Sequence, residues 1–202
     1  MKKSIQGGLA LLLVLASLFL TSEVVSAENG AALERVQEEG VLVVGTSADF
    51  PPFEFYAEVD GERQVVGMDM MIAQKIADDL GVELEIQDIG FDSLLPALEA
   101  RNVDVVIAGM TPTEERRKSV DFSEIYFKTF QNVMVRAEDE DVYTSLESLK
   151  GLPIGVQTGS LQEGLAEQIE DARLMSLTDL NDLLLALKTN RIEAIVMQGP
   201  NA

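Results

Sequence analysis

The sequence predicts an α/β fold with mostly parallel sheets. Short apolar runs rich in valine and isoleucine, typical of buried strands, alternate with segments in which apolar residues recur at helical spacing. Polar turns that contain glycine follow several of these runs. Buried strands separated by helices indicate sheets covered by helices, and such sheets bind ligands beyond the carboxyl ends of their strands.

The first half of the chain supplies strands, helices and one hairpin. The dipeptide Asp60-Gly61 favours a hairpin turn, and Gly81 favours a C-cap for the helix that precedes it. Pro96 falls within a second expected helix. The expected elements are strands at 41–46, 82–86 and 103–107, a hairpin at 56–66, and helices at 69–80 and 91–100.

The second half repeats the alternation of strands and helices. The charged run at 137–141 is expected to be an exposed turn. The expected strands lie at 132–136, 153–157, 174–176 and 192–197, and the expected helices lie at 145–149, 160–169 and 180–189.

The first 27 residues have the three parts of an export signal. Two lysines near the start precede an apolar core at 9–20, and small residues end at Ala27. The core is short for a membrane span, so a retained anchor is the less favoured alternative. We therefore expect a signal peptide at 1–27 that is cleaved after Ala27, a polar lead at 28–39, and a periplasmic or extracellular protein.

Composition excludes several classes of chemistry. The chain has no histidine and no cysteine, which rules out Ser-His-Asp triads, cysteine nucleophiles, disulfides and zinc sites built from these residues. Its net charge of −20 argues against nucleic acid and anionic membranes as partners. The composition thus favours a binding protein over an enzyme, and no cofactor or metal is expected.

The segment 103–123 contains a candidate anion site. Its strand ends at a glycine, after which Thr111 can cap a helix, Pro112 suits the first helical position, and Glu114 completes a capping box. Arg116 would then lie in the first helical turn, beside free backbone N–H groups. This combination predicts a receptor for a carboxylate. The alternative is an ordinary turn with a solvated arginine.

A second turn of the same design follows the strand at 153–157. Ser160 and Glu163 form another capping box, preceded by a glycine. Two helix N-termini from the two halves of the chain could hold one anion between them.

Several motifs together resemble a known family. They are GTSADFPPFEF, VGMDMMIAQKIADDLG, FDSLLPAL, DVVIAGMTPTEERRKSVDFS, LESLKGLPIGVQTGSLQE and NRIEAIVMQGPNA. In this order and spacing they are similar to the periplasmic solute-binding proteins of family 3, the receptors of ATP-driven importers for polar amino acids. The resemblance covers nearly all of residues 40–202.

The resemblance implies a two-lobed periplasmic-binding-protein fold of type II that closes over its ligand. The first lobe would span 40–127 and the second 128–202. It also implies a monomer that binds a polar amino acid and delivers it to the membrane permease of an ABC importer.

Matching positions imply site roles at the α-carboxylate end of the ligand. Arg116 would bind the carboxylate, helped by Thr111 and by the backbone N–H of Leu161. Gly109 would offer its carbonyl to the ligand ammonium. Arg117 leaves open which of the two arginines points inward, and the family match favours Arg116.

Other matching positions would surround the ligand side chain. Phe50 and Phe91 would sandwich it, although Phe91 could equally be a core residue. Ser47 and Gln157 would contact its tip, although Ser47 could be a turn serine and Gln157 is ambiguous as a strand-end residue. Neither of these two is a carboxylate, which argues mildly against a strongly basic side chain.

Gln198 stands where the family usually has an acidic residue that pairs with the ligand ammonium. Losing one charge-assisted hydrogen bond is worth roughly 1.5–3 kcal/mol. Binding would then be weak, or another acid such as Asp49 would compensate, or the ligand would not be an ordinary α-amino acid.

The chain also ends before the segment with which the family returns to the first lobe, so we expect a partial sequence with an incomplete second lobe and closure.

Two functional alternatives remain. One is an exported dehydratase that acts on prephenate-like acids, with Asp49 or Glu54 as its acid. The other is a ligand-sensing module.

Overall fold

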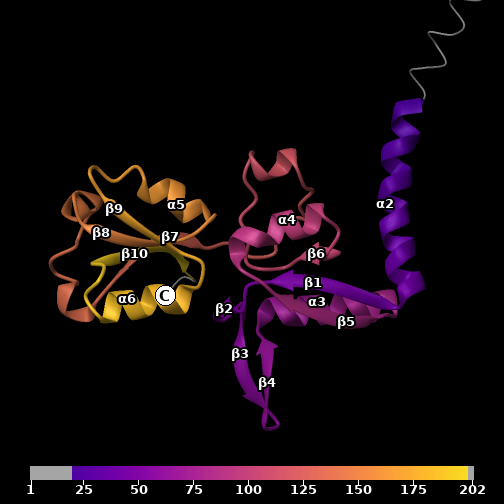
Figure 1. Cartoon of the computed structure of the whole chain (residues 1–202), viewed down its shortest axis with the longest axis horizontal. Helices are drawn as coiled ribbons and strands as arrows, with labels where there is room; N and C mark the ends of the chain where they lie inside the picture. Colours follow the sequence, from indigo (N-terminus) through magenta and orange to yellow (C-terminus); the bar gives the residue numbers. More distant parts are fainter. Residues whose placement is uncertain (1–19, 200–202) are drawn as a thin grey trace, which may run out of the picture.

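The computed structural model describes residues 20–199, which form two lobes lying side by side (Figure 1). The first lobe contains β1 to β6, and the second contains β7 to β10. The boundary predicted between residues 127 and 128 falls in the segment that joins β6 to β7 and stays a prediction. The predicted signal peptide lies mostly outside the described residues.

The first lobe is built on a parallel three-stranded sheet in the order β5-β1-β6. Apolar residues of β1 and α3 form its core, with Val44, Ala73 and Ala77 fully buried. Gly81 ends α3 in the left-handed conformation, as predicted. The elements are β1 (Val41–Thr46), α3 (Met68–Leu80), β5 (Glu83–Asp88), a 3-10 turn at Phe91–Ser93 followed by α4 (Leu94–Glu99), and β6 (Val105–Val106).

The strand expected at 103–107 is shorter than predicted. Only Val105 and Val106 pair with β1. Just before them, the Asp104 carboxylate accepts a hydrogen bond from the backbone N–H of Val43 at 2.8 Å. The backbone N–H of Asp104 donates in turn to the Val43 carbonyl. The side chain thus takes a hydrogen bond that a longer ladder would have used.

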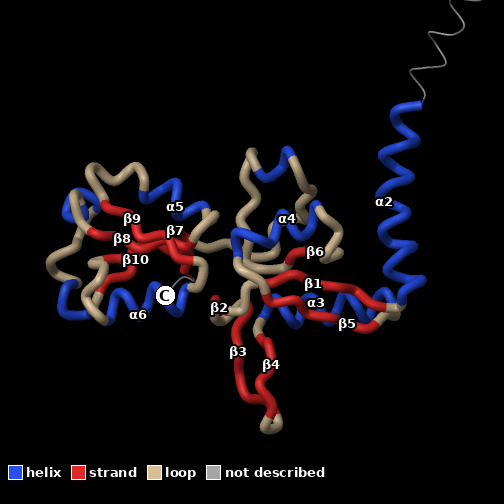
Figure 2. Tube along the Cα trace, in the orientation of Figure 1, coloured by secondary structure: helices blue, strands red, loops and turns tan. Residues whose placement is uncertain are grey.

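The predicted hairpin is confirmed and projects away from the sheet (Figure 2). Its strands β3 (Glu54–Val59) and β4 (Glu62–Val66) are joined by Asp60 and Gly61, both with positive φ. The short β2 (Asp49–Phe50) pairs with the start of β3 inside the loop expected at 47–54. The start of the hairpin is therefore paired with the loop that follows β1.

The polar lead at 28–39 forms the second part of a long helix, α2 (Leu20–Glu39), which the sequence did not lead us to expect. Val36 anchors its end in the core of the first lobe. Arg35 forms an ion pair with Asp104.

The second lobe has a four-stranded sheet in the order β7-β10-β8-β9, parallel except for β7. One core cluster joins α6 to the sheet through Leu183 and Ile195, and another lies between Leu149, Ile154 and α5. The elements are β7 (Phe130–Val135), 3-10 turns at Ala137–Asp139 and Leu146–Leu149, β8 (Pro153–Gln157), α5 (Leu161–Ala166), β9 (Arg173–Leu177), α6 (Leu180–Lys188) and β10 (Ala194–Gly199).

The prediction of a helix that begins at Thr111 is wrong. Only a single 3-10 turn at Arg116–Lys118 forms, and Thr111 and Glu114 make no capping box. Instead, Thr113 accepts the Arg116 N–H at 3.2 Å, while the Thr111 hydroxyl points across to the second lobe. Tertiary contact of Thr111 therefore overrides the local capping signal.

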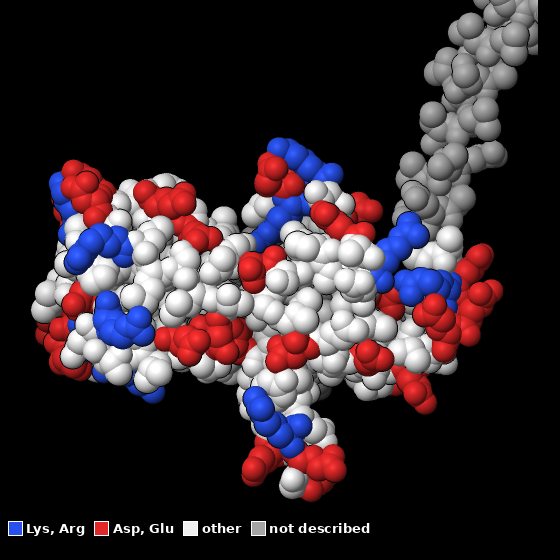
Figure 3. Space-filling view, in the orientation of Figure 1, with Lys and Arg blue, Asp and Glu red and all other residues white. Residues whose placement is uncertain are grey.

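Acidic side chains are spread over both lobes on the face seen in Figure 3, with basic ones scattered among them. No helix within residues 20–199 combines the length and apolar character needed to cross a membrane.

We expect Gly67→Ala to lower the free energy of unfolding by more than about 3 kcal/mol. Gly67 has φ +129°, and a Cβ there would lie 2.1 Å from the Phe53 carbonyl oxygen, a backbone atom that cannot turn aside. Gly61→Ala is the matched control, because Gly61 also has positive φ but has open space around it. The control should lose only about 1 kcal/mol. Equal losses in urea unfolding would contradict the steric explanation.

Candidate functional site

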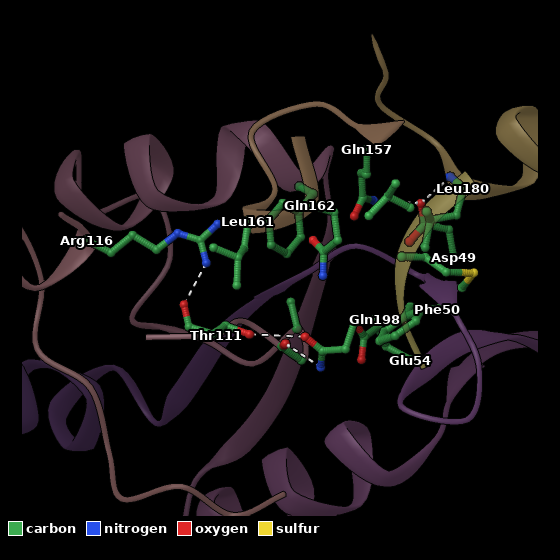
Figure 4. Close-up of a pocket in the computed structure, with 15 residues that line it drawn as sticks. Asp49, Phe50, Glu54, Thr111, Arg116, Gln157, Leu161, Gln162, Leu180 and Gln198 are labelled. Atoms are coloured by element: carbon green, nitrogen blue, oxygen red, sulfur yellow. Dashed lines mark hydrogen bonds between the residues drawn. The ribbon is translucent and has the colours of Figure 1, made fainter. Parts of the chain in front are cut away.

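A pocket lies between the lobes, at the carboxyl ends of β1, β6, β8 and β10 (Figure 4). Eight of the nine predicted ligand-binding positions line it. The lining residues are Asp49, Phe50, Glu54, Phe91, Ala108, Gly109, Thr111, Arg116, Gln157, Leu161, Gln162, Leu180, Val196, Met197 and Gln198.

Ser47 is the predicted position that does not line this pocket. Its side chain is buried, and its hydroxyl lies 3.4 Å from a carboxylate oxygen of Asp49. The structure therefore places Ser47 behind Asp49.

Arg116 lies at one end of the pocket (Figure 4). Its guanidinium donates to the carbonyl of Thr111 at 2.7 Å and, across the cleft, to the carbonyl of Gly159 at 3.0 Å. It also lies over the ring of Phe91, 5.5 Å from the centroid. Burial lowers the pKa of Arg116 below its ordinary value, and none of the ion pairs among the described residues involves it. A half-buried guanidinium without a carboxylate partner is a ready site for an anion.

Arg117 points elsewhere, since its guanidinium lies 5.3 Å from the centroid of the Phe122 ring. The structure thus selects Arg116 as the arginine of the pocket.

The turn before α5 has half of its predicted capping box. The Ser160 hydroxyl accepts the N–H of Glu163 at 3.3 Å, as expected. The Glu163 carboxylate reaches the N–H of Gly159 at 2.9 Å instead of the N–H of Ser160. This arrangement fixes the turn that presents Leu161 to the pocket.

Gln198 connects the end of β10 to the first lobe. Its amide oxygen accepts the Thr111 hydroxyl at 3.0 Å, and its amide nitrogen lies 3.4 Å from the carbonyl oxygen of Gly109. The carbonyl that the family resemblance assigns to a ligand ammonium is therefore bonded by the Gln198 amide.

Asp49 lies at the opposite end of the pocket from Arg116 (Figure 4). One carboxylate oxygen accepts the backbone N–H of Leu180 at 2.8 Å and the side-chain amide of Gln157 at 3.2 Å, both from the second lobe. Burial raises the pKa of Asp49 to about 6, although the hydrogen bond from Leu180 partly offsets this. Asp49 therefore joins the two lobes as well as lining the cavity.

Glu54 is a second acid in the pocket lining, and it is almost completely buried. Burial, followed by the charge of Asp69, raises its pKa to about 10. One of its carboxyl oxygens has no hydrogen-bond partner. Glu54 is thus protonated at neutral pH.

Sequence reasoning named Asp49 and Glu54 only as alternatives, and it missed Asp69 as the neighbour of Glu54. A signal was present in each case. Glu54 stands between two phenylalanines and Asp69 between two methionines, so each acid is placed where the pattern demands burial.

A comparison with protein families matches residues 42–198 to the bacterial extracellular solute-binding proteins, family 3. The chain belongs to this family. The resemblance inferred from the motifs is thereby confirmed, and with it the two-lobed α/β fold.

Individual relatives agree with the family. The chain is 41% identical to the "Arginine-binding extracellular protein ArtP" of Bacillus subtilis over 78% of its own length, and it spans only 60% of the length of that relative. A crystal structure of an amino acid ABC transporter substrate-binding protein from Streptococcus pneumoniae bound to L-arginine is 40% identical. Its TM-score is 0.81, and the match covers 83% of this chain and 70% of that one. An ancestral amino acid-binding protein, AncCDT-1, described as a precursor of cyclohexadienyl dehydratase, is 32% identical with a TM-score of 0.78 over 82% of this chain and 73% of that one.

We expect Glu54→Gln to raise the melting temperature by several degrees at pH 8 and to leave it nearly unchanged at pH 4.5. The folded protein holds a proton on Glu54 that the unfolded chain releases above about pH 4.5, so the native chain loses stability as pH rises from there towards 10. Glutamine removes this loss. Calorimetric melting across the pH range would measure it, with the exposed Glu58→Gln as control. Parallel pH profiles for the native chain and Glu54→Gln would contradict the assignment.

Proposed function

We propose that this chain is the ligand-binding part of an exported receptor that takes up a basic amino acid, with arginine favoured, and delivers it to the permease of an ABC importer. One observation carries the proposal. The pocket has a half-buried guanidinium at one end and two buried carboxyl groups elsewhere in its lining. A molecule with a carboxylate and a side-chain cation matches this arrangement.

The carboxylate of the ligand would bind at Arg116. The guanidinium now donates to two neutral carbonyls, and a carboxylate offers a stronger, bidentate acceptor in their place. The hydroxyl of Thr111 and the backbone N–H of Leu161 lie in the same lining and would complete the site.

The side-chain cation would lie near Asp49 and Glu54, with the rings of Phe50 and Phe91 beside its aliphatic stem. Aromatic faces and carboxylates both attract a guanidinium. In the sequence, the neutral Ser47 and Gln157 argued against a basic side chain in the ligand. Asp49 and Glu54 in the pocket lining now favour one.

The α-ammonium would bind at the carbonyl of Gly109, where it would take the place of the Gln198 amide nitrogen that now lies 3.4 Å away, with the amide oxygen of Gln198 as a second acceptor. Neither group carries a charge. This end of the ligand is therefore the one that the pocket holds least strongly.

The family and the names of the relatives point to a receptor in preference to an enzyme. AncCDT-1 itself is described as an amino acid-binding protein. The rest of the proposal is a signal peptide cleaved after Ala27, a periplasmic location, a monomer, no bound cofactor and no nucleic-acid partner.

Thermal unfolding with each common amino acid, followed by calorimetry, tests the proposal. L-arginine is expected to raise the melting temperature, because a ligand that binds only the native state stabilises it. Arg116→Lys should weaken arginine binding by about tenfold to a hundredfold through loss of the bidentate contact. Arg117→Lys should leave the affinity unchanged. A melting temperature indifferent to every amino acid, or equal effects of the two variants, would overturn the proposal.

We further expect Gln198→Asp to tighten the binding of an α-amino acid by about tenfold to a hundredfold. A carboxylate there would add a charge-assisted hydrogen bond to the α-ammonium, worth roughly 1.5–3 kcal/mol. Titration calorimetry with L-arginine measures the change. Unchanged or weaker affinity would show that the α-ammonium does not bind beside residue 198.

A further inference from the structure

Glu54 of β3 and Asp69 of α3 form a buried pair of acids. Their side chains are 1% and 0% exposed, and the two carboxyl groups interact as hydrogen-bond partners. Each nevertheless keeps a buried oxygen without a donor, Oε2 of Glu54 and Oδ1 of Asp69. Ionised carboxylates can only accept hydrogen bonds, so two of them side by side leave such oxygens unsatisfied. A single proton turns one carboxyl into a donor and relieves both the repulsion and the missing bond.

The hydrogen bonds around the pair indicate which group holds the proton. Asp69 accepts the N–H of Gly109 at 2.7 Å and the hydroxyl of Tyr126 at 2.9 Å, both at Oδ2. These two donors satisfy Oδ2 of Asp69. The Glu54 side chain has no such donor: its Oε2 is without a partner, and its interaction is with the carboxyl group of Asp69. The proton therefore belongs on Glu54.

The charges that face Glu54 all favour this proton. Burial, Asp69 and Asp49 each raise its pKa, and no positive group is among the causes. Tyr126 also faces the pair, and burial together with Asp69 raises the pKa of its phenol, so it stays a neutral donor. Arg116 is engaged by carbonyls at the end of the pocket nearest Gly159.

The pair is reached from the ligand pocket. Glu54 is a lining residue, and its Oε1 lies beside Gly109, 3.9 Å from where a Cβ would stand on that glycine. Figure 4 shows Glu54 next to Phe50 and Gln198. A cation that enters the pocket can thus approach the carboxyl group that holds the proton.

We propose that Glu54 and Asp69 share one proton in the ligand-free protein, and that the side-chain cation of a bound basic amino acid displaces this proton to solvent. This deepens the proposed function and rests on it. The exchange balances, because the neutral carboxyl of Glu54 loses H⁺ to water and becomes a carboxylate that pairs with the incoming guanidinium. The guanidinium keeps its own protons throughout.

The exchange makes binding depend on pH. Because one proton leaves for each ligand bound, the dissociation constant should fall by about tenfold for each unit by which the pH is raised near neutrality. An ordinary preformed carboxylate would give no such slope.

Titration calorimetry of the purified chain with L-arginine at pH 7.5, in buffers of different ionisation enthalpy, counts the released protons directly. Asp49 is already ionised at this pH, because its pKa is about 6, so it contributes little. We expect about one proton released per arginine. L-citrulline, which has the same shape but a neutral end group, should bind without releasing a proton.

Variants add an independent check. Glu54→Gln should abolish the proton release and weaken arginine binding at least tenfold, whereas the exposed Glu58→Gln should change neither. If Glu54→Gln does not fold, the comparison of arginine with citrulline on the unmodified chain still decides. Arginine binding without proton release, or equal release with citrulline, would overturn the exchange and leave the proposed function standing. Failure of arginine to bind at all would overturn both.

Discussion

The carboxylate of Asp69 is the interaction on which the site depends. It is fully buried at the start of α3, where it accepts the N–H of Gly109 and the hydroxyl of Tyr126. Gly109 has φ +53°, so the chain turns sharply there and its N–H faces away from the sheet ladder. A buried N–H without an acceptor costs about as much as a lost hydrogen bond. Asp69 thus fixes the turn from which Thr111 and Arg116 extend, and it ties the segment leading into β7 to the same point.

The two lobes meet through polar groups that a ligand would also use. Asp49 accepts from Leu180 and Gln157, the Thr111 hydroxyl donates to Gln198, and the guanidinium of Arg116 donates to Gly159. The backbones also approach closely, because a Cβ on Gly159 would lie 3.2 Å from the Cα of Asp92. Donors and acceptors of the pocket are therefore partly paired with each other across the cleft. A ligand favours this closed arrangement only by the difference between its own contacts and those it replaces.

The sequence predicted the framework well because burial and turn chemistry are local signals. The strands at 41–46 and 153–157 agree with the structure at both ends, and Gly81 ends its helix as expected. The signal failed where a distant partner decided the outcome. The sequence around Thr111 predicted a helix cap. In the folded protein the Thr111 hydroxyl instead donates to Gln198, a residue far along the chain that lies beside it only when the two lobes come together. The family match placed eight positions at the pocket, while Ser47 lies outside its lining, with its hydroxyl 3.4 Å from a carboxylate oxygen of Asp49.

The buried acids explain why the neutral residue at position 198 suits this pocket. Asp49, Glu54 and Asp69 already place three carboxyl groups at or just below it, and in our proposal the pair of Glu54 and Asp69 holds one proton. A fourth carboxylate beside Gly109 would grip an ammonium more firmly, but it would also raise the proton affinity of Glu54 by like-charge repulsion. The amide of Gln198 avoids that repulsion and still bonds to both Thr111 and Gly109. In the proposed complex the pocket would place its charged contacts at the α-carboxylate and at the side-chain cation, and it would leave the α-ammonium to uncharged dipoles. Selectivity for a basic side chain would then come from the acids, because a ligand without the distal cation would gain nothing from them and would leave the proton where it is.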